Sequence, residues 1–226
     1  MTRDADVPTA STEWRVSPGL VSYPSAMAQM DERVERVAAG QAPELVWLLQ
    51  HPSLYTGGTS AVVSELLSPD RFPVYRTGRG GRFTYHGPGQ RVVYLVLDLR
   101  QRGQDLRRFV WQLEEWLIRS LGRLGVVAGR RQGLIGVWVA TAPDIDAKIA
   151  AVGVRVRRWI SCHGVAINVT TDLRHFEGIV PCGVRDHGVT SLEALGSKLT
   201  MADLDAALAL EFEPLLAPTV AATAQP

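Results

Sequence analysis

Cys182 is the residue of this chain whose type and surroundings most directly support nucleophilic chemistry. It lies in Ile179-Val-Pro-Cys-Gly-Val184, where proline and glycine predict a turn that presents the thiol instead of burying it. A thiol attacks a carbonyl carbon only as the thiolate, so a neighbouring group must accept its proton. The candidates for that group are His86, His163, His175, His187 and Lys148.

Lys148 stands out because lysine is rare in this chain. Of the 24 basic residues, 22 are arginines, and Lys148 and Lys198 are the only lysines. An ammonium group can lose its proton, whereas a guanidinium group stays charged. Lys148 begins the apolar run Lys148-Ile-Ala-Ala-Val-Gly153, and an ammonium beside a thiol would lower the thiol's pKa and could take up its proton. The alternative is a lysine exposed at the edge of a strand.

A glycine-rich segment, Arg76–Gln90, could form a ligand site. Its five glycines would let backbone amides approach a ligand closely, and the neighbouring arginines could bind an anion or a carbonyl group. The phosphate-loop pattern G-x-x-x-x-G-K-[ST] is absent. A single Arg-Gly-Gly step within a folded region is not typical of RNA-binding tails, so we expect no nucleic-acid partner. A glycine-rich hairpin would explain Gly87-Pro88-Gly89 but not the arginines and His86.

Composition excludes several other classes of protein. Two cysteines cannot form a disulfide framework, and we expect Cys162 to be buried in a strand. The apolar runs are too short for a membrane span, and no secretory signal is visible, so we expect a cytoplasmic protein. A zinc site made from His86, His163, Cys182 and His187 would have irregular spacing. We therefore expect neither a metal nor another cofactor.

Charge is divided unevenly along the chain although the net charge is only +1. Residues 71–158 contain 17 basic and 6 acidic residues, whereas the rest contains 7 basic and 17 acidic residues. Such a division favours an anionic partner for the central region. Added salt would then weaken the binding of that partner. Alternatively, the acidic flanks neutralise these arginines in the folded protein.

The hydrophobic pattern predicts the elements that must position these residues. Apolar spacing and capping residues predict helices at 22–39, from Asp105 to about 124, and from Thr200 to about 212. Because helices and strands do not alternate regularly, we expect an α+β fold with a mixed, largely antiparallel sheet flanked by helices. We expect one domain over 13–213, with flexible ends at 1–12 and 214–226. Strands are expected at 44–49, 73–77, 82–86, 91–99, 134–140, 148–155 and 159–170.

Five ordered blocks of the chain resemble the lipoyl(octanoyl) transferase family. With His51-Pro-x-x-Tyr55-Thr56 they span about residues 20–210. Two departures are visible: Thr56-Gly-Gly-Thr59 lacks the Gly-Arg that many members carry there, and Cys162 occupies a variable position. The blocks are Arg79-Gly-Gly-x-x-Thr-Tyr-His-Gly-Pro-Gly-Gln90, Lys148-Ile-Ala-Ala-Val-Gly153, His163-Gly-x-Ala-Ile-Asn168, Pro181-Cys-Gly183 and Val189-Thr-Ser191.

The resemblance implies a fold like that of biotin and lipoate ligases, and an activity that moves an octanoyl group. The donor would be octanoyl-acyl carrier protein, and the acceptors would be lysines on the lipoyl domains of 2-oxoacid dehydrogenase E2 subunits and on the glycine cleavage H protein. Cys182 would form a thioester with the acyl group, and Lys148 would activate it. The implied acyl site consists of Arg79, Gly80, Gly81, Arg82, Phe83, Thr84, Tyr85, His86, Ala151, Val152, Gly153, Gly164, Val165 and Ala166.

Three other functions remain compatible with these residues. An ATP-dependent lipoate-protein ligase would share the fold and a catalytic lysine but would not need Cys182. A cysteine hydrolase would use a histidine in place of Lys148 and release the acyl group to water. A non-catalytic module that binds acyl carrier protein would tolerate the loss of both residues.

Overall fold

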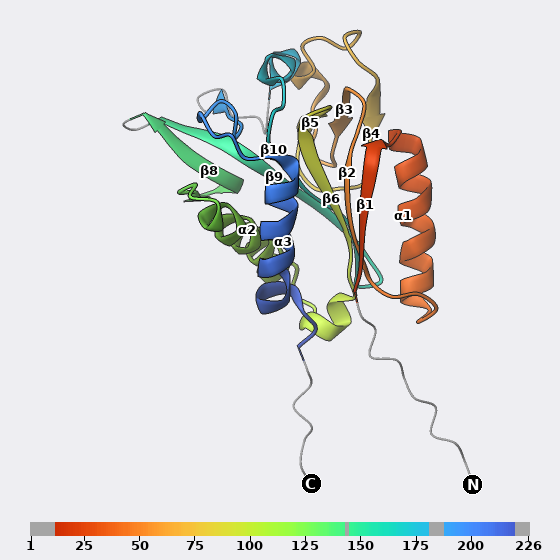
Figure 1. The fold of residues 1–226 in the computed structure, drawn as a ribbon. Coiled ribbons are helices and arrows are strands. Elements are labelled where there is room, and N and C mark those ends of the chain that lie inside the picture. Colours follow the sequence, from red (N-terminus) through yellow and green to blue (C-terminus); the bar gives the residue numbers. More distant parts are fainter. Residues whose placement is uncertain (1–11, 143–144, 181–187, 220–226) are drawn as a thin grey trace, which may run out of the picture.

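The computed structural model describes residues 12–142, 145–180 and 188–219, so Pro181, Cys182, Gly183 and His187 lie outside the described residues. Its strands form two sheets (Figure 1). The larger sheet has the order β1-β2-β6-β10-β9-β8-β7, with β11 paired to β9, and the smaller has the order β4-β3-β5. The strands are β1 (Glu13–Leu20), β2 (Leu45–Gln50), β3 (Leu54–Gly57), β4 (Val74–Arg76), β5 (Phe83–His86), β6 (Gln90–Val96), β7 (Gly129–Arg131), β8 (Leu134–Ala142), β9 (Ile145–Arg157), β10 (Ile160–Asn168) and β11 (Gly188–Val189).

The pairing confirms a mixed, largely antiparallel sheet. Three pairs are parallel, namely β1 with β2, β3 with β4 and β11 with β9, and the other described pairs are antiparallel. The expected strands near 73–77 and 82–86 belong to the smaller sheet. The turn at Gly87–Gly89 therefore passes from one sheet to the other and does not close a hairpin.

Three α-helices begin where the capping residues predict. They are α1 (Tyr23–Ala38), α2 (Leu106–Arg123) and α3 (Met201–Leu216). The side chain of Ser22 accepts a hydrogen bond from the first turn of α1, and Asp105 does the same for α2. Thr200 and Asp203 form a capping box at the start of α3. Short 3₁₀ helices connect the larger elements: η1 (Val63–Glu65), η2 (Leu99–Arg102) and η3 (Leu173–Gly178).

The third helix ends later than its sequence indicated. It continues through Pro214 to Leu216, whose side chain is buried and whose carbonyl accepts a hydrogen bond from Arg102. Proline at 214 removes the amide that would bond the carbonyl of Leu210, and Leu210 lies on an exposed face where water can satisfy that carbonyl. The helix therefore runs past the expected domain boundary at 213, because packing holds 214–216 in it.

Alternation along the central strands divides the core between the two faces of the large sheet. In β6, Val93 and Leu95 pack with α2 and α3, whereas Val92, Tyr94 and Val96 pack with α1. A strand covered on both faces has no solvent side, which explains why its sequence is almost continuously apolar. Cys162 of β10 is buried on the α1 face, as expected.

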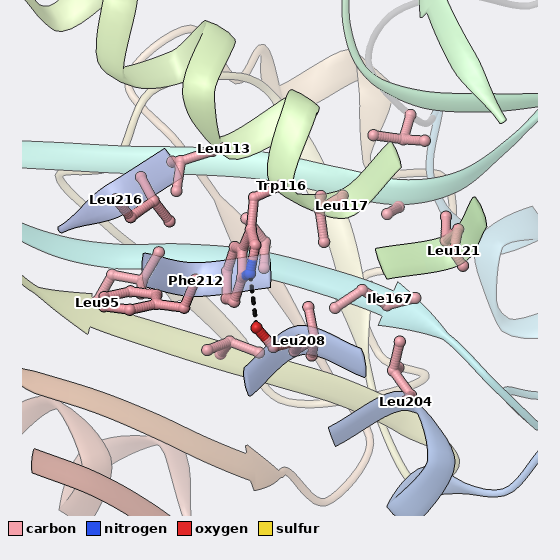
Figure 2. Packing of buried hydrophobic residues seen from close by; sticks show 14 of the residues in the cluster. Leu95, Leu113, Trp116, Leu117, Leu121, Ile167, Leu204, Leu208, Phe212 and Leu216 are labelled. Atoms are coloured by element: carbon pink, nitrogen blue, oxygen red, sulfur yellow. Dashed lines mark hydrogen bonds between the residues drawn. The ribbon is translucent and has the colours of Figure 1, made fainter. Parts of the chain in front are cut away.

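The helical layer opposite α1 is held by close packing between α2 and α3. Figure 2 shows Trp116 of α2 among Leu208, Phe212 and Leu216 of α3, over Leu95 of the sheet. The indole nitrogen of Trp116 donates to the carbonyl of Leu208 at 2.8 Å, so this large side chain is buried with its polar atom satisfied. This layer fixes α2, whose first turns reach the cavity described below.

Among the residues that the structure describes, six arginines of the central region pair with acidic residues of the flanks. Arg102 and Glu44 form a fully buried ion pair at 2.5 Å, and Arg91 pairs with Asp205 at 2.7 Å. Arg82 likewise pairs with Glu65. Folding thus neutralises part of the charge division, as the second interpretation of the charge pattern expects, and leaves other arginines of this region exposed.

No helix in the described parts of the chain has the length and apolar character needed to cross a membrane.

Candidate active site

A cavity of about 480 Å³ lies between the two sheets. One wall comes from β5 and the loop that precedes it, and the opposite wall comes from β6, β9 and β10. Its volume falls within the range of small-molecule sites. All but one of the residues expected at the acyl site line it, together with Lys148: Arg79, Gly80, Gly81, Arg82, Phe83, Thr84, His86, Ala151, Val152, Gly153, Gly164, Val165 and Ala166.

Tyr85 is the exception, because its side chain does not line this cavity. Neighbouring side chains in a strand point to opposite faces, so Tyr85 turns away from the side that presents Thr84 and His86. Its ring packs against Tyr55 and Phe176 in a separate hydrophobic cluster. Among the residues expected at the acyl site, Tyr85 therefore packs away from this cavity.

Several lining residues were not found by sequence reasoning. Tyr94 and Val92 face the cavity from β6, where alternation could have assigned them to the same face as Ala166. Leu106 and Val110 come from the first turns of α2, and nothing local in the sequence indicates that this helix end reaches the cavity. Tyr23, Thr56, Ser60, Val154 and the segment 133–135 also belong to this group. His163 lines the cavity as well, although the sequence indicated it only as a candidate proton acceptor.

Lys148 is buried in the wall of the cavity, with only 6% of its surface exposed. A β-bulge in the pairing of β8 with β9 lies beside it, and such irregularities redirect side chains. Its ammonium nitrogen donates to the carbonyl of Ile135 at 2.8 Å and lies 4.6 Å from the centre of the Trp138 ring. These contacts exclude the alternative of a lysine exposed at a strand edge.

Arg79 organises the loop that forms one side of the cavity. Its guanidinium donates to the carbonyls of Gly80 and Thr56, each at 2.8 Å, and to that of Arg82 at 3.1 Å. It also donates to the Thr56 hydroxyl at 2.7 Å. Planar guanidinium groups suit several acceptors at once, and here the acceptors belong to the protein itself. Arg79 thus holds the glycine-rich loop in place.

Two of the expected cavity glycines serve different purposes. A Cβ atom at Gly80 would meet only the Val154 carbonyl, at 3.7 Å, so this position opens into the cavity. A Cβ atom at Gly164 would lie 2.2 Å from the Val93 carbonyl, a distance that real side chains do not tolerate. Gly164 is therefore required by the close approach of β10 to β6, and not simply to leave room for an acyl chain.

The histidines around the cavity are neutral. Burial lowers the pKa of His86 to about 3, and His86 shares a hydrogen bond of 2.7 Å with Gln90. Burial, followed by the charge of Arg79, lowers the pKa of His163 to about 4. His163 has a φ of +62°, is 7% exposed, and has both ring nitrogens buried without a hydrogen-bond partner among the described residues.

These lowered pKa values predict a loss of stability in mild acid. The unfolded chain binds protons on histidine below about pH 6.5, whereas the folded His86 and His163 stay neutral until about pH 3 to 4, so the unfolding free energy decreases as pH falls through this window. Each histidine contributes up to about 1.4 kcal/mol per pH unit there. Asparagine tolerates positive φ, so His163→Asn should remove one such contribution.

Thermal unfolding as a function of pH measures this effect. Between neutral and mildly acidic pH, the melting temperature of the unmodified protein should fall further than that of the His163→Asn variant. Equal pH dependence in the two proteins would show that His163 is not held neutral.

Among the described residues, no three histidine, cysteine, aspartate or glutamate side chains are arranged to hold a metal ion.

Comparisons with known proteins show the family of this chain and agree with its fold. The model of the lipoyl protein ligase A/B catalytic domain matches residues 22–213. The octanoyltransferase of Paramagnetospirillum magneticum is 60% identical over 200 residues, which cover 88% of this chain and 94% of that protein. The octanoyltransferase of Maricaulis maris is 57% identical over 210 residues, covering 92% and 93%.

A solved structure supports the fold. The bipartite lipoate protein ligase of Thermoplasma acidophilum matches with a TM-score of 0.67 at 19% identity, covering 91% of this chain and 84% of that one. At this identity the likeness shows the architecture alone, which is the ligase-like α+β fold expected from the sequence. The chain therefore belongs to the lipoyl protein ligase A/B catalytic domain family, among the octanoyltransferases, and is a transferase enzyme.

Proposed function

We propose that this enzyme moves an octanoyl group from octanoyl-acyl carrier protein to a specific lysine of lipoyl domains, through a thioester on Cys182. The acceptors would be 2-oxoacid dehydrogenase E2 subunits and the glycine cleavage H protein, in the cytoplasm. The observation that carries this proposal is the high identity to proteins named octanoyltransferase over almost the whole chain. The cavity supports it, because its lining is mainly apolar and includes one buried lysine.

In the first step, the thiol of Cys182 would lose its proton to Lys148 and attack the carbonyl carbon of the carrier thioester. A new carbon–sulfur bond forms on Cys182, and the bond to the carrier's sulfur breaks. Lys148 then returns the proton to the departing carrier thiolate. One thioester replaces another, so this step needs no ATP.

In the second step, the ε-amine of the acceptor lysine would attack the Cys182 thioester. The amine loses a proton to Lys148 as the amide bond forms, and the proton passes to the Cys182 thiolate as the thioester breaks. An amide is more stable than a thioester, which drives transfer forward. Both steps use one proton-accepting group in the cavity, and Lys148 suits this role better than His86 or His163, whose low pKa values make them weak bases.

The strand that follows the segment containing Cys182 also supports the proposal. Val189 pairs directly with Lys148, and the amide of Thr190 donates to the Lys148 carbonyl at 2.9 Å. On the other side of the segment, the amide of Val180 donates to the Glu65 carbonyl at 2.7 Å. The backbone of 188–190 is therefore fixed beside Lys148.

A reconstituted reaction without nucleotide tests the proposal against its alternatives. Octanoyl-acyl carrier protein, the enzyme and a lipoyl domain should yield octanoylated lipoyl domain in the absence of ATP. A strict requirement for ATP would instead indicate a ligase, and release of free octanoate without acylation of the lipoyl domain would indicate a hydrolase. Binding of the carrier without any turnover would indicate a non-catalytic module.

Two exposed arginines next to a cavity-lining residue would attract an acidic carrier protein. Arg107 and Arg108 are exposed on the first turn of α2 and form no ion pair with any other described residue. They follow Leu106, which lines the cavity although it is 45% exposed. Changing Arg107→Glu together with Arg108→Glu should raise KM for octanoyl-acyl carrier protein about tenfold at low salt, with less effect at high salt.

Steady-state kinetics with the carrier-bound donor and with a small octanoyl thioester check this result. Only the carrier-bound donor should respond, because the small thioester lacks the acidic carrier protein that these arginines would bind. The control Arg36→Glu with Arg119→Glu makes the same change in net charge at arginines whose neighbours in sequence do not line the cavity. If the control variant raises KM for octanoyl-acyl carrier protein by the same factor, binding of the donor depends only on the overall charge of the enzyme.

A further inference from the structure

One peptide group connects Lys148 to a buried carboxylate on the neighbouring helix. The carbonyl of Ile135 accepts the hydrogen bond from the Lys148 ammonium at 2.8 Å. The amide N–H of the same peptide group belongs to Gly136, and it donates to Oε1 of Glu114 at 2.8 Å in a buried contact. Hydrogen bonds in such a chain polarise one another, so the carboxylate on the N–H makes the carbonyl a stronger acceptor for the ammonium.

The position of this peptide group depends on a glycine. Gly136 has a φ of +124°, where side chains are strained. A Cβ atom there would lie 2.8 Å from the Ala150 carbonyl and 3.2 Å from the ammonium nitrogen of Lys148. Any side chain at position 136 would therefore collide with the Ala150 carbonyl and the Lys148 side chain, so this position requires glycine. Glycine has no side chain that could anchor the peptide group. The contact from Glu114 is what holds this peptide from the helix side.

Glu114 itself is an unusual residue for its place in α2. It is 7% exposed and lies in the sequence between Leu113 and Trp116, both of which are buried. Its second oxygen accepts from Nε of Arg130 at 3.1 Å. Burying a carboxylate costs free energy unless it is well bonded, and both oxygens of Glu114 are engaged.

Glu115 offers a close comparison within the same helix. It binds the same Arg130, at 2.9 Å, and also Arg119, at 2.9 Å. Within the described residues it forms no hydrogen bond with the 135–136 peptide, and it does not line the cavity. Ion pairing with Arg130 is thus shared by the two glutamates, whereas the contact with Gly136 belongs to Glu114.

We propose that Glu114 is a positioning residue that orients the Ile135–Gly136 peptide, so that the Ile135 carbonyl holds the Lys148 ammonium where the reaction needs it. This inference rests on the proposed role of Lys148. Glu114 is not a cavity-lining residue and acts through the peptide group, without touching substrate. A carboxylate that served only to fasten α2 to β8 would be equally buried, so the test must separate the two roles.

Two conservative substitutions separate the contact from the charge. Glu114→Gln keeps an oxygen that can accept from Gly136 but loses the negative charge. Glu114→Asp keeps the charge but is one methylene shorter, so its oxygens fall short of the Gly136 amide. Glu115→Ala is the matched control, since it removes an ion pair to Arg130 and leaves the peptide contact intact.

The measurement is the single-turnover rate of enzyme acylation by octanoyl-acyl carrier protein as a function of pH. Glu114→Asp should slow acylation about 10- to 100-fold and move the rising limb of the pH–rate profile to higher pH, because a loosely held ammonium stabilises the thiolate less. Glu114→Gln should recover the rate to within a few-fold. Glu115→Ala should match the unmodified enzyme in both rate and profile.

The outcomes distinguish this inference from the proposed function. If Glu114→Asp has the rate and pH profile of the unmodified enzyme, or if Glu114→Gln is impaired as much as Glu114→Asp, the positioning role is wrong. An equal fall in the melting temperature of both variants, with unchanged pH profiles, indicates a fastening role only. If Lys148→Ala itself leaves acylation unchanged, the proposed function fails first, whatever the Glu114 variants do.

Discussion

Cys182→Ala should lower the rate of octanoyl transfer to a lipoyl domain by about a thousandfold or more. Without the sulfur the acyl group has no covalent carrier, and the remaining groups can only bring donor and acceptor together. The effect should appear in kcat and not in KM, because the thiol contributes to the reaction and little to binding. The increase in mass of the lipoyl domain over time measures the rate.

Cys162→Ala is the matched control for this experiment. Cys162 is 3% exposed on the α1 face of β10, and burial raises the pKa of its thiol to about 11. It is therefore protonated at neutral pH and should not react. Its alanine variant should keep full activity with a small loss of stability. If Cys182→Ala stays active while Cys162→Ala does not, the assignment of the nucleophile is wrong.

Lys148→Ala should slow transfer by about 10²- to 10⁴-fold, the usual contribution of a general acid–base group. The same residue would accept a proton in both half-reactions, so acylation of the enzyme and transfer to the lipoyl domain should both slow. Lys148→Arg should not restore the rate, because a guanidinium keeps the positive charge but cannot accept a proton at accessible pH. Single-turnover rates for each half-reaction, measured separately, give the two effects.

Lys198 supplies the control, since it is exposed and is the only other lysine in the chain. Lys198→Ala should leave both half-reactions unchanged. Lys148 is buried, so thermal unfolding must show that its variants are folded at the assay temperature. Folded Lys148→Ala with normal rates in both half-reactions would remove Lys148 from the chemistry.

The sequence predicted features that depend on neighbouring residues along the chain. Ser22, Asp105 and Thr200 mark the first turns of the helices, because capping is a contact between a side chain and the backbone only a few residues away. The continuous apolar run of β6 likewise indicated a strand buried on both faces. The family resemblance brought most of the cavity residues together without any structural information.

Features that depend on distant partners could not be predicted in this way. The membership of β5 in a separate sheet follows from its pairing with β3, and that pairing turns Tyr85 away from the cavity. The first turns of α2 reach the cavity only because α3 and the sheet hold that helix in place. Glu114 showed a weak signal, since it is a charged residue within the apolar stretch of α2, but its partner at Gly136 is visible only in the folded protein.

The central claim is that the acyl group rests on Cys182 between donor and acceptor. Intact-protein mass spectrometry after mixing the enzyme with octanoyl-acyl carrier protein, with no acceptor present, tests it most directly. The enzyme should gain the mass of one octanoyl group, peptide mapping should place it on Cys182, and hydroxylamine should remove it, as it removes a thioester. An enzyme that transfers octanoyl groups to a lipoyl domain but never carries this adduct, or carries it on another residue, would contradict the account.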